Sequence, residues 1–369
     1  MLLGTYIMFP PVSVLDMAAF TQVFLRHTRI VTGGDWLPIA LILWALVWLL
    51  VWRGISLTAR SVIAVEAVSL LLIAALIVVI FVRLGTGNAP GRQTLTPDVF
   101  KLPRGTGLAA VGFACTYGIL SFGGFESSTS AGEESCRPTE AIPRSVLAAV
   151  LFGTVFYAFC VSGQVLGFGA GPAGVARFAR STAPLGDLTL IYVGPAMAAV
   201  LSALGAALVG VAVASRTLYA LARDRILASA LATVSHQTGT PAGAVTASMT
   251  LTFALLLSYG LAGTGALDAF FYLATTGALS LLVVYVLVSV SALRLHVLGR
   301  DKRRLPAAVL PLGGAVAALY VLYRNLIPAP AFPYSLFPYL VGGWLVLGLT
   351  VAAAMPQLRR RVSEGLAPS

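Results

Sequence analysis

The sequence is 369 residues long, with 58% hydrophobic and only 10% charged residues. Soluble domains carry about 25% charged residues, so this much apolar sequence cannot all enter a soluble core and must face lipid. The net charge of +11 does not indicate nucleic-acid binding, because the basic residues gather at the ends of apolar stretches, where they set membrane orientation. We therefore expect an all-α, polytopic membrane protein without a soluble domain.

Ten apolar stretches are long enough, at about 20 residues each, to cross a bilayer as helices. In chain order they cover residues 2–25, 36–53, 60–83, 107–126, 145–169, 188–215, 242–263, 268–293, 305–324 and 334–355. The first is the least regular, because it contains Pro10, Pro11 and Asp16. Together they predict a single transmembrane domain across residues 1–369.

Acidic residues inside the early spans are candidate functional groups, because ionisable side chains in a membrane are costly and usually mark a pathway. Glu66 lies near the start of the third span. It could accept a proton, or it could pair with Arg60 at the membrane surface. Asp16 is the weaker candidate, because its span is poorly defined.

The fourth span follows a loop and ends in an unusual stretch. Residues 84–106 are rich in Gly, Pro and Thr and predict an extracellular loop. The span itself runs into "SFGGFESSTSAGEES", where Gly123 and Gly124 each weaken a helix by about 1 kcal/mol relative to Ala. A helix broken at membrane depth is tolerated beside a polar cavity, and transporters use such breaks to bind substrate. Alternatively, the helix ends near residue 122 and Glu126 is an acid at the membrane edge.

The middle of the chain adds a charged loop and a small-residue face. Residues 127–144 predict a cytoplasmic loop, in which Pro138 and Pro143 argue against one continuous helix and leave a short loop or interfacial helix. In the sixth span small residues recur every four positions, which favours close helix packing over a substrate-facing surface. They are Gly194, Ala198, Ser202, Ala206, Gly210 and Ala214.

Loop charge sets the expected orientation. Basic residues are more numerous at the span ends that include the loop "HVLGRDKRRLP" and the tail "RRRVSEGLAPS". This bias places the C-terminal tail, residues 356–369, in the cytoplasm, and ten spans place the N-terminus there as well. The three cysteines show no paired spacing and the three histidines are isolated, so we expect no disulfide framework, no metal site and no cofactor.

Three stretches carry a recognisable pattern. "SFGGFESSTSAGEESCRPTEAIPRSV" contains Phe-x-Gly-Phe-Glu, then Glu-Glu, then Ile-Pro-Arg, and the other two are "ASRTLYALARDRILASALATVSHQTGTPAGAV" and "LDAFFYLATTGALSLLVVYVLVSVSALRL". Together they resemble the amino acid permeases of the amino acid–polyamine–organocation (APC) superfamily, over nearly the whole chain. The resemblance implies an inverted-repeat, leucine-transporter-like fold, in which the first and sixth helices of the family are broken at the substrate site.

Aligned on these motifs, the first span matches the family's third, so residues 107–126 match the broken sixth helix. The resemblance then places the substrate-binding segment on Ser121, Phe122, Gly123, Gly124 and Phe125, and it places Thr275 and Thr276 beside the pathway. It implies a coupling or gating role for Glu126, and it puts Glu66 near a position where some relatives hold a proton-coupling lysine. The chain would lack the family's first two helices and, with them, half of the expected binding site.

We therefore expect secondary active transport of an amino acid or related amine across the cell (cytoplasmic) membrane by alternating access, coupled to protons or to exchange. The alternative is a transport-incompetent, truncated permease that acts as a structural or regulatory membrane subunit. A membrane-embedded enzyme is disfavoured, because it needs a nucleophile–base pair or a metal cluster, whereas the histidines are scattered and no two acids lie close together inside one span.

Overall fold

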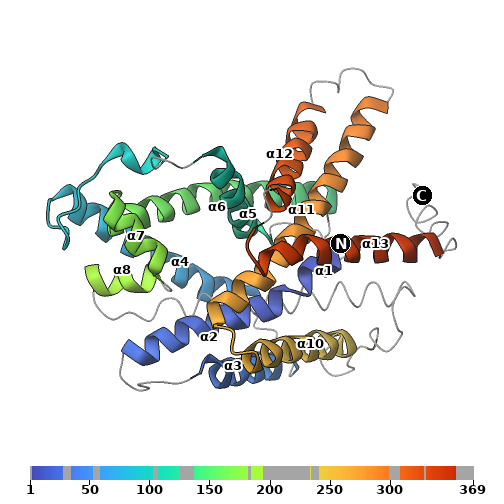
Figure 1. The fold of residues 1–369 in the computed structure, drawn as a ribbon, viewed down its shortest axis with the longest axis horizontal. Helices are drawn as coiled ribbons and strands as arrows, with labels where there is room; N and C mark the ends of the chain where they lie inside the picture. Colours follow the sequence, from blue (N-terminus) through green and yellow to red (C-terminus); the bar gives the residue numbers. More distant parts are fainter. Residues whose placement is uncertain are drawn as a thin grey trace. The chain divides into compact units, whose positions relative to one another are not determined.

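The computed structural model describes residues 2–27, 35–52, 59–102, 107–124, 137–181, 184–193, 233, 241–298, 308–327 and 330–354. These ranges contain helices and connecting turns but no strand. In chain order the elements are α1 (Leu2–Tyr6), α2 (Phe9–His27), α3 (Trp36–Trp52), α4 (Ala59–Gly85), η1 (Pro97–Phe100), α5 (Leu108–Phe122), α6 (Pro138–Phe168), α7 (Pro172–Arg180), α8 (Pro184–Tyr192), α10 (Ala242–Leu261), α11 (Ala266–Leu298), α12 (Val309–Leu326), η5 (Tyr334–Leu336) and α13 (Phe337–Ala354). The expected all-α class is confirmed (Figure 1).

Within the described ranges, six segments are long and apolar enough to cross a membrane. They are Leu2–Ala19, Thr139–Phe168, Ala242–Leu261, Ala266–Arg294, Val309–Leu326 and Tyr334–Val351. Two shorter apolar stretches, Trp36–Val51 and Leu70–Gly85, coincide with expected spans. The chain is therefore a multi-pass membrane protein. The small-residue face expected between Gly194 and Ala214 lies outside the described residues.

The first expected span is divided, with α1 ending at Tyr6 and α2 beginning at Phe9. The backbone N–H of Met8 donates to the carbonyl of Thr5 at 3.1 Å, which is the tighter i→i−3 spacing of a turn. Pro10 and Pro11 lie in the first turn of α2, where a proline is tolerated because its missing N–H has no partner within the helix to lose. The two prolines that made this span irregular in the sequence thus lie just after its interruption.

The expectation that Pro138 and Pro143 exclude one continuous helix is wrong. α6 begins at Pro138 and runs for 31 residues with Pro143 inside it, so residues 138–144 are helical and not loop. Pro138 occupies the start of the helix, where its missing N–H has no partner to lose. Pro143 lies only in the second turn, so it removes one hydrogen bond near the helix end. Glu140 and Arg144 form an exposed ion pair at 3.7 Å across the same turn.

Helix α7 was not expected from the sequence. It follows a turn at Gly169, whose φ of +102° favours glycine. A Cβ atom on Gly174 would overlap the carbonyl of Gly169, so only glycine allows this close return of the chain. The Arg177 Nη2 atom donates to the Phe168 carbonyl at 2.7 Å, and the Phe168 and Phe178 rings stack at 5.3 Å. These contacts fix α7 on the end of α6.

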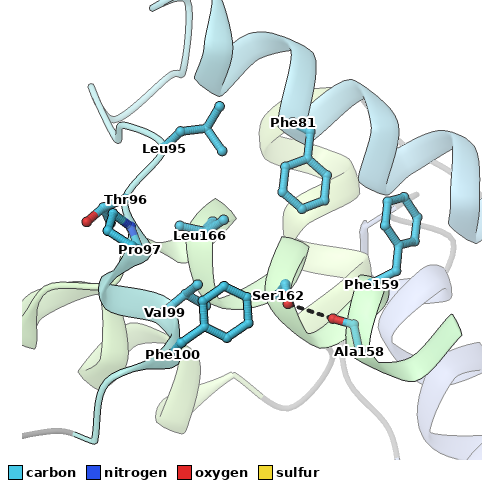
Figure 2. Close-up of a pocket in the computed structure, with 10 residues that line it drawn as sticks. All are labelled: Phe81, Leu95, Thr96, Pro97, Val99, Phe100, Ala158, Phe159, Ser162 and Leu166. Atoms are coloured by element: carbon cyan, nitrogen blue, oxygen red, sulfur yellow. Dashed lines mark hydrogen bonds between the residues drawn. The ribbon is translucent and has the colours of Figure 1, made fainter. Parts of the chain in front are cut away.

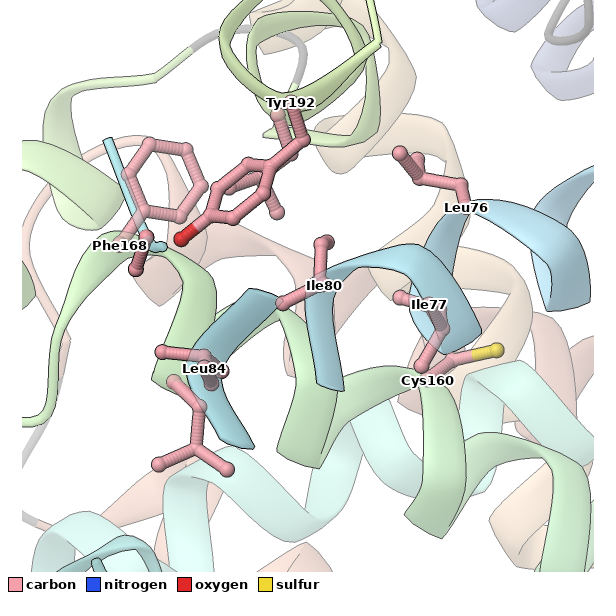
Figure 3. Packing of buried hydrophobic residues seen from close by; sticks show 10 residues of the cluster. Leu76, Ile77, Ile80, Leu84, Cys160, Phe168 and Tyr192 are labelled. Carbon is pink, nitrogen blue, oxygen red and sulfur yellow. The ribbon is translucent and has the colours of Figure 1, made fainter. Parts of the chain in front are cut away.

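The chain divides into two compact units, which we describe separately. One unit contains α2, α3, α4, η1, α6, α7, α8 and α10. In it, α4 presents Leu76, Ile77, Ile80 and Leu84 to α6 and α8 (Figure 3). A Cβ atom on Gly163 of α6 would lie 2.5 Å from Ile77 Cγ2, so a small residue allows the close approach of these helices.

A second core of the same unit joins α2, α3 and α10. Met17, Val47, Val245 and Met249 are its buried residues. The indole N–H of Trp44 donates to the Met249 carbonyl at 2.9 Å, and that of Trp36 donates to the Thr264 carbonyl at 2.8 Å. Trp36 and Trp44 thus contribute apolar area and also have hydrogen-bonded indole N–H groups.

The other unit contains α1, α5, α12, η5, α13 and α11 from Tyr272 onward. Its core is built from Leu279 and Leu282 of α11, Ala318 and Val321 of α12, and Phe337 and Val341 of α13. The expected site residues between Ser121 and Gly123, together with Thr275 and Thr276, all belong to this unit.

Candidate functional site

Helix α5 ends near residue 122, which is where both sequence interpretations, a broken helix and a helix that simply ends, place it. Its last residue is Phe122, and Gly123 and Gly124 form a turn. At 15 residues and 1.5 Å per residue, α5 is about 22 Å long, which is less than the roughly 30 Å of a bilayer core. If its Leu108 end lies at the membrane surface, its C-terminal end therefore lies within the hydrocarbon region.

Gly124 has a φ of +118°, a backbone conformation that side-chain-bearing residues rarely adopt. A Cβ atom added there would meet nothing within 4 Å. Glycine is therefore favoured here by the backbone conformation, since there is space for a larger side chain. Ser121 is exposed, and Phe122, Gly123 and Gly124 are half-buried. Phe125 and Glu126, the remaining residues of the predicted site segment, lie outside the described residues.

The two threonines expected beside the pathway lie on α11, which is continuous for 33 residues. Thr275 is buried, with 3% of its surface exposed. The Thr276 hydroxyl donates to the carbonyl of Tyr272 at 2.9 Å, and the Ser280 hydroxyl donates to the carbonyl of Thr276 at 3.0 Å. The hydroxyls of Thr276 and Ser280 are thus satisfied by their own helix, as serine and threonine in membrane helices often are.

The end of α5 and this part of α11 border the same hydrophobic core within one unit. Ile119 of α5 and Tyr272 of α11 both pack against the cluster of Leu279, Leu282, Ala318, Val321, Phe337 and Val341. Ile119 lies one turn before Phe122, and Tyr272 lies one turn before Thr276. Residues one turn before the end of α5 and one turn before Thr276 therefore both contact this cluster.

An aromatic group beside Thr276 was missed by the sequence reasoning. Tyr272 contacts Tyr334 with ring centroids 5.4 Å apart and Phe337 at 5.7 Å, and Tyr334 contacts Phe337 at 5.5 Å. The three rings meet mostly edge to face, which is the favoured aromatic geometry. The aromatic residues of "FFYLATTG" and "FPYSLFPY" were a signal for it, but nothing in their spacing paired one stretch with the other.

A buried polar contact between α5 and α12 was also missed. The Asn325 Nδ2 atom donates to Thr116 Oγ1 at 2.7 Å and to the Val321 carbonyl at 2.8 Å. Asn325 is 3% exposed and Thr116 is 1% exposed. Thr116 precedes Phe122 by six residues on α5, so this bond fixes the helix whose end forms the candidate site. An asparagine directly after the predicted span 305–324 was the signal that could have identified it.

The two acids proposed in the early spans lie in the other unit. Glu66 lies in α4, about two turns after the helix begins, and its side chain is outside the description. Asp16 lies in α2, half-buried, next to Met17 of the α2–α3–α10 core. In the described part of the chain, no three His, Cys, Asp or Glu side chains gather in a way that could hold a metal ion.

Comparison with known proteins agrees with this architecture. A family model described as "Amino acid permease" matches residues 10–323. Uncharacterized transporters of Mycobacterium tuberculosis and Mycobacterium bovis are 28% identical over 320 residues, which cover 82% of this chain. The chain spans 62% of the length of these relatives. A family match over most of the sequence, on a helical multi-pass framework, shows that the chain belongs to the amino acid permease family.

Proposed function

We propose that the protein is a secondary active transporter of amino acids or related amines in the cell membrane, with both termini in the cytoplasm. It works by alternating access and is coupled to protons or to exchange of a second solute. The family membership supports a permease function, and the transporter names of the relatives agree with it. The loop charges support the orientation.

One observation carries the proposal: α5 is too short to cross a bilayer and ends in a glycine turn with a positive φ. The carbonyls at the C-terminal end of a helix point along its axis and carry partial negative charge. Inside a membrane they favour a cationic group. We therefore assign the ammonium group of the substrate to the end of α5, around Ser121 to Gly124, with Phe122 and Phe125 contacting its side chain.

Thr275 and Thr276 form the opposing wall of the proposed site. The support for this assignment is that α5 and this part of α11 belong to one unit and that Ile119 and Tyr272 border the same core cluster. Because the Thr276 hydroxyl already donates to its own helix, it offers the substrate an oxygen acceptor. Coupling is assigned to Glu126, which follows the break directly, and secondarily to Glu66 in α4.

The proposal is tested by counterflow of a radiolabelled amino-acid panel in proteoliposomes containing the full chain. We expect uptake of at least one amino acid or amine, and we expect Thr276→Val to weaken it by removing an acceptor oxygen. Ser291→Ala is the matched control, because the Ser291 hydroxyl also donates to its own helix, to the Leu287 carbonyl at 2.8 Å. An equal loss in both variants would contradict the site on α11.

A second candidate is a structural or regulatory membrane subunit without transport activity. Counterflow separates the two candidates. A folded, reconstituted protein that exchanges none of the panel would favour the subunit, whereas saturable exchange would exclude it.

A further inference from the structure

The unit that contains α4 and α6 has a groove that none of the candidate transport-site residues lines. The groove is an open cavity of about 560 Å³ between α4, the chain around η1 and the last turns of α6 (Figure 2). Phe81 of α4 and Phe159 of α6 stack at 5.6 Å on one side. The opposite side carries Leu95, Pro97, Val99 and Phe100. Its volume falls within the range of about 300–1,000 Å³ typical of ligand pockets.

The rim of the groove has the character of a membrane–water interface. Phe100 is 82% exposed, Leu95 is 51% exposed and Leu102 is 56% exposed. The same stretch carries Lys101, whose side chain is 73% exposed. Exposed aromatic and aliphatic side chains beside a lysine are typical of the zone where lipid headgroups meet the hydrocarbon core. Water alone would be an unfavourable neighbour for so much apolar surface.

The short 3₁₀ helix η1 separates the apolar and charged side chains. Residues three apart share a face in such a helix, so Pro97 and Phe100 lie on one face and line the groove. Asp98 and Lys101 share another face and form an ion pair at 2.7 Å. The hydrogen bond between them lowers the pKa of Asp98 and raises the pKa of Lys101, so both groups are charged at neutral pH.

We propose that this groove binds one acyl chain of a zwitterionic phospholipid, phosphatidylethanolamine, while Lys101 and Asp98 bind its headgroup. The phosphate meets the Lys101 ammonium, and the ethanolamine ammonium meets the Asp98 carboxylate. Exposed groups of opposite charge, side by side on the face of η1 next to the one that lines the groove, match a headgroup that carries both charges. A purely anionic headgroup has no ammonium for the Asp98 carboxylate, so Lys101 alone would offset the repulsion between that carboxylate and the phosphate.

The occupant is tested by native mass spectrometry of the full chain, extracted from vesicles of equal phosphatidylethanolamine and phosphatidylglycerol. We expect one retained lipid, mainly phosphatidylethanolamine. Ala158→Trp fills the groove from α6, where Ala158 is exposed, and should lower retention at least about tenfold, the effect of losing two buried methylenes. Val155→Trp is the matched control, because Val155 is 71% exposed on the same helix and does not line the groove.

One further pair of variants and one change of charge keep the test independent of folding. Phe100→Ala removes an exposed wall of the groove and should also release lipid, whereas Leu102→Ala should not. Asp98→Asn should abolish the preference for phosphatidylethanolamine over phosphatidylglycerol. Equal retention of the two lipids by the unaltered chain would overturn the proposal. So would unchanged retention in Ala158→Trp, or a dimer that Ala158→Trp dissociates, which would assign the groove to a second copy.

Discussion

The hydrogen bond between Asn325 and Thr116 should stabilise the position of α5 and, through it, the candidate site. Both residues are almost completely buried, and Asn325 Nδ2 lies 2.7 Å from Thr116 Oγ1. Thr116 is six residues before Phe122, about 9 Å along the helix axis. A loosened contact between α5 and α12 would therefore shift the end of α5 directly.

The expected size of the effect follows from the bonds each residue makes. Interhelical hydrogen bonds in membrane proteins contribute about 0.6 kcal/mol on average and at most about 1.7. Thr116→Val leaves Asn325 with its bond to the Val321 carbonyl, so we expect a cost near the average. Asn325→Leu removes both bonds and leaves Thr116 without its donor, so we expect about 1–2 kcal/mol.

A double-mutant cycle measures the bond itself. Unfolding in mixed micelles, followed by tryptophan fluorescence, should give a coupling energy between Thr116→Val and Asn325→Leu of about 0.5–1.7 kcal/mol. Thr350→Val is the control, because the Thr350 hydroxyl is exposed and donates only within α13, to the Val346 carbonyl at 2.8 Å. Its effect should add to that of Asn325→Leu. A coupling energy within about 0.3 kcal/mol of zero for the Thr116 pair would refute the reasoning.

Three further tests, the first two with a control variant, probe Gly277, Gly124 and Glu126. Gly277→Ala should be tolerated, because its Cβ would lie in ordinary van der Waals contact, 3.4 Å from Met8 Cβ. The larger side chain of Gly277→Leu should displace the α1–α2 turn and lower the free energy of unfolding by about 1–3 kcal/mol. Gly124→Ala should cost about 1–3 kcal/mol because of the φ of +118°, whereas Gly118→Ala, which meets nothing within 4 Å, should be neutral or stabilising in the same unfolding assay. If Glu126 titrates during transport, Glu126→Gln should flatten the pH dependence of uptake in proteoliposomes, and an unchanged pH profile in well-expressed protein would exclude the coupling role.

The sequence could predict the helical membrane architecture because that prediction needs only local information. A run of apolar residues as long as a bilayer is thick has to form a helix, whatever its neighbours are. The end of α5 was predictable for a similar reason, since two adjacent glycines weaken a helix wherever they occur. The prolines of α6 show the limit of this reasoning. Pro143 is disfavoured in a helix interior, yet near the start of a 31-residue apolar helix its cost is small enough to be accepted.

The sequence by itself determined that this chain spans a membrane, and it determined where one helix should end. Only the tertiary structure decided which distant residues support that point. Thr116 and Asn325 are 209 positions apart, and the rings of Tyr272, Tyr334 and Phe337 come from separate elements. The groove beside η1 also depends on how α4 and α6 pack. Such contacts depend on which helices pack together and at what register, and the apolar pattern of a membrane helix, hydrophobic on every face, does not encode either.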